Sequence, residues 1–464
     1  MMDNFIALII YWGVWLLIPI VVDGITTLYS LIGVSLVHLK NYRNRIPSLQ
    51  SHPLISIIIP VYNSEETLEA CLCSIAAQDY PSHSMEVHLI NNGSSDRSHN
   101  IFVRLREKLP LHMGWYSTFD KGKAFAMNAG IHMANGAYIF NIDSDVVLAP
   151  DAVRKVVEEM EFKRDLGAVT GAIQVLPPKQ DEHPLTRLLA QCEFFEYLTA
   201  FQVGREHQTL MQNIYTLSGA FSVFRRELLL QTGLYRNITV TEDTDLTFEL
   251  HEHYGDWRIA CVSSAIAYVH PIESFNALYA QRVRWQRGQL EVSARHMELM
   301  QQPLWLLRGF SPARNLLIDH TLAFPRIVWT FLLPALALFG YPLSLIVTAF
   351  LVLYGFYMLI DLAWVSVAWL GVNHNARQRL ISFLWLIPVM PFYRMVVFWF
   401  RISGFLHAVA EPGTWRVQDP LVQLEQGVAN LRDYIGNALD RSPVKIPVLQ
   451  ERFGGRNPAD RNDR

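Results

Sequence analysis

The sequence predicts a soluble α/β domain flanked on both sides by transmembrane helices. The 464 residues are 51% hydrophobic and only 17% charged, a balance that favours a soluble part joined to membrane segments. Long apolar runs stand before and after a central region in which short buried-strand patterns alternate with helix-like segments. This alternation implies a mostly parallel sheet covered on both faces.

The first segment, 1–45, is expected to lie in the membrane. Residues 5–39 are apolar apart from Asp23 and His38, and basic residues follow within 40–45. A single helix of that length would rise about 50 Å, more than a hydrocarbon core of about 30 Å. The segment therefore forms two short spans, which we favour, or one span that continues along the interface. The basic residues place its end in the cytoplasm.

The central region, 46–300, is expected to be the α/β domain. Short apolar runs predict strands and helical spacing of apolar residues predicts helices. The predicted strands cover 54–60, 86–91, 137–143 and 167–175, and the predicted helices cover 64–78 and 123–134. In such sheets ligands bind beyond the carboxyl ends of the strands, so polar residues that follow a strand are candidate site residues.

The next region, 301–410, is expected to hold interfacial helices and about three spans. Three apolar runs are each long enough to cross a membrane: 321–341, 343–371 and 380–400. Arg377 and Arg379 indicate a cytoplasmic link between the last two runs. We expect Asp361 and Arg394, which lie inside the runs, to face a protein interior or a wet path.

Two prolines, Pro388 and Pro391, are positioned to break the last apolar run, so the side on which the tail ends stays open. The tail itself, 411–464, is polar, and we expect its extremity to be disordered.

Charge and cysteine content exclude some classes of protein. The net charge of −3 and pI near 6.6 give no bulk attraction to nucleic acid. The four cysteines show no paired metal-ligand spacing, and we expect buried thiols in a reducing compartment.

An acid pair stands at the carboxyl end of the strand predicted at 137–143. Asp143 and Asp145 flank a single residue, and two such carboxylates can share a hard divalent cation that neutralises a diphosphate. The alternative is an ordinary surface turn, in which Asp-x-Asp is also common.

Other polar groups are expected at the same edge of the sheet. Two loops that follow strands are suited to bind a base or a ribose; the alternative is that they are plain turns with a helix N-cap. Lys123, at a helix start, is suited to bind a phosphate; the alternative is a solvated lysine. An acid cluster at another helix start either belongs to the site or only favours the helix dipole. The candidates are Pro60, Tyr62, Asn63 and Glu65 in the first loop, Asn92 and Asp96 in the second, and Glu242 and Asp243 in the cluster.

The stretch QRVRWQRGQ, 281–289, concentrates positive charge shortly before the apolar runs. Arg282 and Arg287 are expected to face anionic lipid. Gln281, Arg284 and Trp285 are three and four residues apart and so share one helical face, which we expect to turn towards the site.

Together these elements resemble the family 2 glycosyltransferases, in particular the membrane-embedded branch of poly-N-acetylglucosamine, hyaluronan and cellulose synthases. The resemblance covers about 55–290. A second, looser resemblance is to the exosortase-associated glycosyltransferases of Gram-positive bacteria. The motifs that carry the first are PVYNSEE, NNGSSD, KGKAFAMNAG, DSD, LSGAFSVFRRELL, TED at 241–243, and Gln281-x-x-Arg284-Trp285.

The resemblance implies a cytoplasmic GT-A domain, which is Rossmann-like, that binds a nucleotide diphosphate sugar, usually UDP-linked, with Mg²⁺ or Mn²⁺. It implies that Asp143 contacts the nucleotide and shares the metal with Asp145. Asp243, next to Glu242, would be the general base of an inverting displacement. Trp285 would form the floor beneath the acceptor sugar, and Arg284 would meet the diphosphate or the acid cluster.

One departure from the family pattern concerns the nucleotide base. Family members commonly have an aspartate where this chain has Asn92. Its amide oxygen can accept a hydrogen bond from a uracil N–H, or its NH₂ group can donate to a ring carbonyl, and both readings stay open.

Two classes of function follow. The first is an active multi-pass enzyme of the cell membrane that extends an exopolysaccharide or adds one sugar to a lipid-linked acceptor, working with partner proteins of an export or surface-sorting system. The second is a non-catalytic membrane scaffold or transporter component with a degenerate nucleotide-sugar domain. The complete set of motif residues favours the first.

Overall fold

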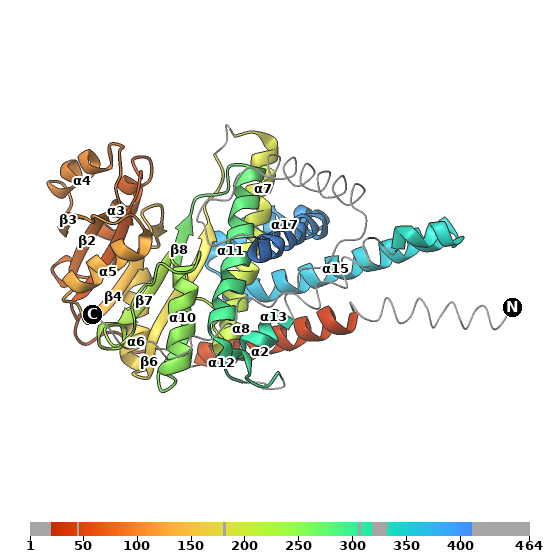
Figure 1. Ribbon diagram of the computed structural model, residues 1–464, viewed down its shortest axis with the longest axis horizontal. Coiled ribbons are helices and arrows are strands. Elements are labelled where there is room, and N and C mark those ends of the chain that lie inside the picture. Colours follow the sequence, from red (N-terminus) through yellow and green to blue (C-terminus); the bar gives the residue numbers. More distant parts are fainter. Residues whose placement is uncertain are drawn as a thin grey trace, which may run out of the picture. The chain divides into compact units, whose positions relative to one another are not determined.

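A mixed β-sheet forms the centre of the α/β part of the chain (Figure 1). The computed structural model describes residues 20–43, 46–179, 182–304, 308–317, 331 and 333–410, all within one compact unit, Met1–Val417. Within these ranges eight strands form one sheet in the order β3-β2-β1-β4-β7-β6-β8-β5. They are β1 Ile55–Val61, β2 Met85–Asn91, β3 His112–Ser117, β4 Tyr138–Ile142, β5 Val147–Leu148, β6 Leu166–Val175, β7 Phe221–Arg225 and β8 Arg258–Val269.

The strands predicted from the apolar runs are confirmed as β1, β2, β4 and β6. Strands β1 to β4 are parallel to their neighbours within this group. Beyond β4 the sheet is mixed, because β7 runs antiparallel to both β4 and β6 and β5 runs antiparallel to β8, whereas β6 and β8 are parallel. Phe221, the first residue of β7, pairs with Ile142, the last of β4. The segment before β7 therefore lies at the carboxyl edge of β4.

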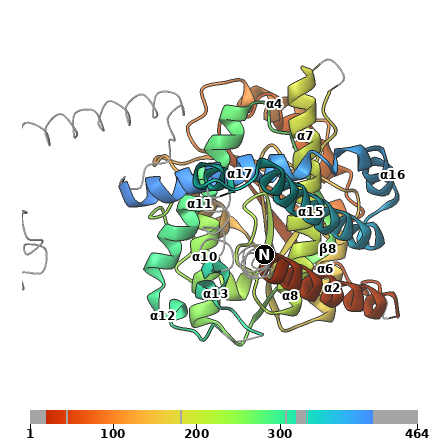
Figure 2. The same cartoon turned by 90° about the vertical axis from the view of Figure 1, so that its right-hand side faces the viewer.

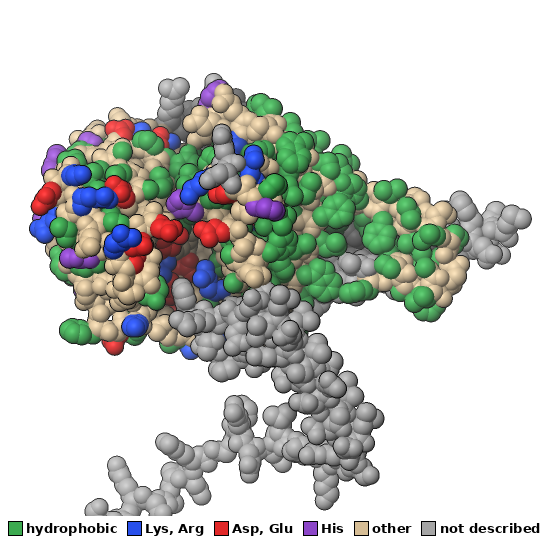
Figure 3. All heavy atoms as spheres, turned by 90° about the horizontal axis from the view of Figure 1, so that it is seen from above, with side chains coloured by type: hydrophobic (Ala, Val, Ile, Leu, Met, Phe, Trp, Pro, Cys, Tyr) green, Lys and Arg blue, Asp and Glu red, His purple; other side chains and the backbone are tan. Residues whose placement is uncertain are grey.

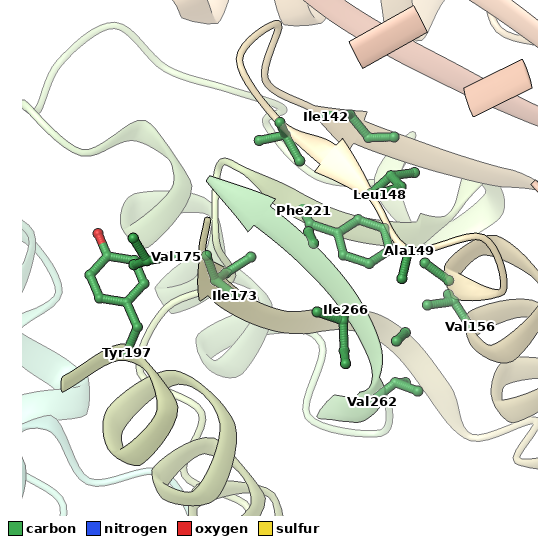
Figure 4. Close-up of a cluster of buried hydrophobic side chains, with 14 of the residues drawn as sticks. Ile142, Leu148, Ala149, Val156, Ile173, Val175, Tyr197, Phe221, Val262 and Ile266 are labelled. Atoms are coloured by element: carbon green, nitrogen blue, oxygen red, sulfur yellow. The ribbon is translucent and has the colours of Figure 1, made fainter. Parts of the chain in front are cut away.

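Helices cover both faces of the sheet, as predicted. Successive residues of β1 point to opposite faces, so that Ile57 and Ile59 join one buried cluster and Ile58 joins another. The first cluster packs under α3 and α6 and continues through β7 and β8, where Phe221 and Ile266 lie in contact with neighbouring apolar side chains (Figure 4). The second packs under α5. The helices are α3 Leu68–Ala76, α4 Ser98–Arg106, α5 Lys123–Met133 and α6 Ala152–Phe162.

The second half of the domain adds longer helices. Helix α7 passes through a π-helical segment, η3, directly into α8, and α11 packs against α10 and α17 (Figures 1 and 2). The bounds are α7 Pro184–Tyr197, η3 Leu198–Val203, α8 Gly204–Leu210, α9 Arg226–Leu229, α10 Glu242–His253, α11 Phe275–Arg295, α12 Met297–Met300 and α13 Pro312–Leu316.

The apolar helices flank this domain. Among the described residues one helix is long and apolar enough to cross a membrane, α15, and a shorter apolar stretch covers Thr27–Leu36. Helix α2 lies beside α15 and α8 (Figures 1 and 2). The bounds are η1 Ile20–Gly24, α2 Ile25–Arg43, η5 Leu336–Phe339, α15 Leu343–Gly371, α16 His374–Ser382, η6 Leu384–Leu386 and α17 Met390–Ala410.

The predicted spans fare differently. The run 343–371 matches α15, whereas most of the run 321–341 and residues 1–19 lie outside the described residues. The run 380–400 is interrupted near the two prolines that were expected to break it, because α16 ends at Ser382 and α17 begins only at Met390. Pro388 precedes α17 and Pro391 occupies its first turn, where a missing N–H costs nothing.

Polar groups inside the apolar helices have partners, as expected for ionisable residues at such positions. Arg394 of α17 pairs with the buried Asp361 of α15. The Tyr357 hydroxyl donates to Asp23 over 2.8 Å. The link between α15 and α17 touches the sheet, since Arg379 donates to the carbonyls of Val175 and Leu176 at the end of β6.

All four cysteines are free. The expectation that they are buried is wrong for Cys73, which is exposed on α3, whereas Cys71 and Cys192 are buried and Cys261 is partly so. Cys71 and Cys73 are two residues apart on a helix, so they point to different sides.

Candidate active site

Charged side chains from three elements meet at the carboxyl edge of β4. Lys123, the first residue of α5, places its Nζ 2.6 Å from Asp143 Oδ1 and 3.8 Å from Glu242 Oε1. Asp243, the next residue of α10, accepts a hydrogen bond from the Gly219 backbone N–H over 2.9 Å. The structure thus brings together Lys123, Asp143, Glu242 and Asp243, as the sequence predicted.

Gly219 lies in the middle of this cluster. A Cβ atom added to it would stand 2.9 Å from Lys123 Nζ, 3.3 Å from Asp243 Oδ2 and 3.9 Å from Asp143 Oδ2. Only a residue without a side chain leaves this space open. The motif LSGAFSVFRRELL does not by itself mark Gly219 as a site residue, because Ser-Gly-Ala before a strand is common. The glycine becomes notable only because β7 starts at the carboxyl edge of β4.

The charges in the cluster perturb one another. Burial alone would lower the pKa of Lys123, but Asp143, Glu242 and Asp243 outweigh it and raise that pKa. Burial, together with Asp243 and Asp143, raises the pKa of Glu242 against the opposing effect of Lys123. Acidic side chains gather in a hollow beside a largely hydrophobic part of the surface (Figure 3). The Lys123 cluster therefore concentrates charges of both signs in a small space.

The loops after β1 and β2 hold each other in place. Asp96 accepts the Glu65 N–H over 2.8 Å and the Ser98 hydroxyl over 2.7 Å, and Glu65 accepts the Arg97 N–H over 3.0 Å. Burial opposes the charge on Asp96, but these hydrogen bonds outweigh it and lower its pKa. Asn63, in the left-handed region at φ 48°, accepts the Ser95 N–H over 2.9 Å. Asn63, Glu65 and Asp96 thus brace the two loops.

Three other predicted residues, Pro60, Tyr62 and Asn92, lie in or beside these loops. Tyr62 is 56% exposed at the loop tip, and Pro60 lies next to the end of β1. Asn92 Oδ1 accepts the N–H of Gly122, the residue before Lys123, over 2.7 Å. This bond ties the loop after β2 to the start of α5.

Helix α11 carries the Gln-x-x-Arg-Trp motif and packs on the turn that precedes Asp243. A Cβ atom on Gly288 would stand 2.3 Å from Thr241 Oγ1, so the two elements are in close contact. The Trp285 ring lies 5.7 Å from the Phe201 ring, nearly perpendicular to it. Gln281 Nε2 donates to the Tyr197 hydroxyl over 3.5 Å, and Arg284 is half-buried on the same helix.

Residues 56–233 match the sequence profile of the family described as Glycosyl transferase family 2. This region is a family 2 glycosyltransferase domain. The predicted resemblance to that family is thereby confirmed. The motifs outside the matched range contact it in space, TED through Asp243 and Gly219 and Gln-x-x-Arg-Trp through Tyr197 and Phe201.

The curated relatives agree with the branch that the sequence suggested. The chain is 30% identical over 241 residues to a poly-β-1,6-N-acetyl-D-glucosamine synthase of Staphylococcus epidermidis, covering 52% of this chain and 56% of that protein. It is 28% identical over 270 residues to the synthase of Staphylococcus aureus strain COL, covering 57% and 63%. These matches span little more than half the length of the relatives. The looser resemblance to exosortase-associated enzymes stays a prediction.

A solved structure shares the fold. A mannosyltransferase from Pyrobaculum calidifontis, solved with GDP-Man and Mn²⁺, superposes with a TM-score of 0.53 at 16% identity, covering 85% of this chain and 99% of that one. The glycosyltransferase domain therefore has a GT-A-like α/β fold, with the mixed sheet described above.

The two arginines expected to face lipid are buried in protein, so that prediction is wrong. Arg282 is 3% exposed and Arg287 is 1% exposed. Arg282 pairs with Glu196 of α7 over 2.7 Å, and Arg287 pairs with Glu291 of its own helix over 2.7 Å. Glu196, which is distant in sequence, compensates the charge of Arg282, and Glu291, one helical turn away, compensates that of Arg287, so both arginines can be buried.

The acid pair after β4 has the chemistry of a hard-cation site. Asp145 is exposed, yet nearby protein atoms partly desolvate its carboxylate, and together with Asp143 they raise its pKa. A divalent cation would relieve this repulsion, and carboxylates that leave room for water and phosphate oxygens suit Mg²⁺ or Mn²⁺. The described residues contain no group of three or more His, Cys, Asp or Glu side chains arranged to hold a metal alone.

Proposed function

We propose that this chain is an inverting glycosyltransferase that moves a sugar from a UDP-linked donor to a polysaccharide or lipid-linked acceptor at the membrane. One observation carries the proposal: Asp243 is fixed on the Gly219 N–H beside the Lys123–Asp143 pair, so a carboxylate and a lysine ammonium group share one small space. A single displacement needs both, a base on the acceptor side and positive charge on the diphosphate side.

The chemistry follows from the placement of these groups. An acceptor hydroxyl oxygen forms a bond to the anomeric carbon of the donor sugar, and its proton passes to an Asp243 carboxylate oxygen. The bond between that carbon and the diphosphate oxygen breaks, and the diphosphate leaves with the electron pair. Thr244 N–H, 2.8 Å from Asp243 Oδ1, and Gly219 N–H orient the carboxylate. Attack from the face opposite the leaving group inverts the anomeric carbon.

On the donor side we assign the diphosphate to Lys123 and to the edge of β4. Asp145, with Asp143, would hold Mg²⁺ or Mn²⁺, which supplies positive charge to the leaving diphosphate. Tyr62, Asn63 and Asn92 would face the nucleotide. On the acceptor side Trp285 would lie beneath the sugar, and Gln281 and Arg284 would line its approach. Glu242 would complete the base site beside Asp243.

The membrane setting and the product class belong to the same proposal. The exposed apolar surface of α15 fits a lipid bilayer, and the contact of Arg379 with the end of β6 puts the α15–α17 link on the same side as the glycosyltransferase domain. Basic residues near that link favour a cytoplasmic domain in a multi-pass protein. The relatives named as poly-β-1,6-N-acetyl-D-glucosamine synthases support polymer synthesis, and make UDP-N-acetylglucosamine the first donor to test.

The scaffold alternative is not favoured, because a degenerate domain has no need to keep Lys123, Asp143 and Asp243 in contact around a glycine. The test supplies purified membranes with a panel of nucleotide sugars and follows release of the nucleotide diphosphate, with Mn²⁺ and with a chelator. We expect release from UDP-N-acetylglucosamine that stops on chelation and returns with metal. A folded preparation that turns over none of the donors would overturn the proposal.

A further inference from the structure

A row of contacts joins α17 to the aromatic ring of Trp285. The Tyr393 hydroxyl of α17 donates to Glu196 Oε2 over 2.8 Å, and Arg282 Nη2 donates to the same oxygen over 2.7 Å. Glu196 stands on α7 and Arg282 on α11. Three helices therefore share one carboxylate oxygen.

The row ends on the acceptor-side aromatic residue. The Arg282 guanidinium lies 4.5 Å from the centre of the Trp285 ring and 5.9 Å from that of Tyr197. A guanidinium at this distance is attracted to the ring face. Trp285 in turn meets the rings of Phe201 and Tyr197, at 5.7 Å and 6.4 Å. The ring of Trp285 is thus held on one side by a cation and on others by aromatic groups.

Burial makes this row stiff. Arg282 is 3% exposed and Tyr393 is 6% exposed. A guanidinium in such a place cannot rotate away from Glu196 without leaving a buried charge unpaired, which is costly. The planar group also has to satisfy Glu196 and the Trp285 ring at once, a geometry that a lysine ammonium does not reproduce.

We propose that Glu196, Arg282 and Tyr393 are positioning residues that fix the Trp285 ring for the acceptor, and that they couple the place of α17 to acceptor binding. This inference rests on the proposed function, in which Trp285 lies beneath the acceptor sugar. In this proposal Arg282 positions the Trp285 ring and does not contact lipid. The donor groups, Lys123 and Asp143, touch none of the three.

The test separates acceptor binding from donor binding. Tyr393→Phe removes one hydroxyl from the row, and Glu196→Gln weakens the ion pair while keeping its shape. Tyr279→Phe is the matched control, because its hydroxyl also joins α11 to α17, through Ser403 over 2.6 Å, without touching Glu196. Each variant is assayed as the full chain with UDP-N-acetylglucosamine and a β-1,6-linked N-acetylglucosamine oligosaccharide.

We expect Tyr393→Phe and Glu196→Gln to raise the KM for the oligosaccharide about tenfold, the loss typical of one hydrogen bond to a charged group. The KM for UDP-N-acetylglucosamine and the slow release of UDP without acceptor should stay as in the unmodified chain and in Tyr279→Phe. A merely structural row would instead raise the KM for the donor and the KM for the acceptor together, or change neither.

Two outcomes overturn the inference: an unchanged oligosaccharide KM in Tyr393→Phe, or an equal loss on the donor and the acceptor side. If Glu196→Gln does not fold, Tyr393→Phe decides, since it leaves the ion pair intact. Should the unmodified chain release no UDP from UDP-N-acetylglucosamine or any other donor, the proposed function fails. If the unmodified chain is active but Tyr393→Phe has the same oligosaccharide KM as Tyr279→Phe, only this inference fails and the proposed function stands.

Discussion

Glu193 on α7 is a buried acid, and its burial disfavours the ionised carboxylate. It is 1% exposed, and its Oε2 accepts the Ile272 N–H over 2.9 Å. Burial raises the pKa of Glu193 from 4.5 to about 7, against the opposing effects of that hydrogen bond and of Arg282, and with a contribution from Glu196. The isosteric change Glu193→Gln removes the charge and keeps the acceptor for Ile272.

The size and sign of the effect follow from linkage. Between pH 4.5 and about 7 the folded chain keeps the Glu193 proton and the unfolded chain loses it. This residue's contribution to the free energy of unfolding is therefore complete below pH 4.5 and is lost as the pH rises to about 7. A pKa of 4.5 in the unfolded chain and about 7 in the folded chain corresponds to a change in the free energy of unfolding of at most about 3 kcal/mol. Glu193→Gln should match the unmodified chain at pH 4.5 and exceed its stability at pH 8.

The assay is thermal unfolding of the detergent-solubilised protein across pH 4.5 to 8. We expect the Tm of Glu193→Gln to equal that of the unmodified chain in acid and to lie about 5 °C higher above neutrality. Glu227→Gln, at an exposed position, is the control and should give parallel curves. Parallel curves for Glu193→Gln as well would refute the reasoning, because the burial of this acid would then have no cost.

Three further predictions concern the site and its support. Asp243→Asn should lower the rate of UDP release about 10²- to 10⁴-fold, as expected for loss of a general base, while Asp256→Asn, at an exposed position, leaves it unchanged. Gly219→Ala should lower kcat at least about tenfold with an unaltered circular dichroism spectrum, because the new methyl group displaces Lys123 from Asp143; full activity would contradict the crowding. Arg379→Met should destabilise the fold by about 1–3 kcal/mol, seen as a lower Tm with an unchanged donor KM, because the carbonyls of Val175 and Leu176 lose their donor.

The burial of Arg282 and Arg287 changes how the stretch QRVRWQRGQ is understood. Positive charge close to apolar helices is typical of a lipid-facing segment, and the sequence offered that interpretation. In the folded chain Arg282 meets Glu196, and Arg287 meets Glu291, whose other carboxylate oxygen accepts the Val240 N–H over 3.1 Å. Both arginines therefore brace the glycosyltransferase domain.

The sequence by itself determined strands β1, β2 and β4 and the acids at their edge, but not β3. Short apolar runs such as Ile55–Val61 favour buried strands, and the carboxyl ends of parallel strands meet at one edge, so Asp143 was placed near the loops after β1 and β2. Lys123 and Asp243 joined it through motifs that the chain shares with family 2 glycosyltransferases.

Only the tertiary structure decided the direction of β7, the crowding at Gly219 and the burial of Arg282. Each depends on a partner that is distant in sequence or on the path of the backbone: β7 turns back along β4, Gly219 meets Lys123, and Arg282 meets a carboxylate 86 residues away. Local sequence patterns indicate which apolar residues will be buried. The free-energy cost of burying a charge depends instead on the opposite charge that the fold places beside it.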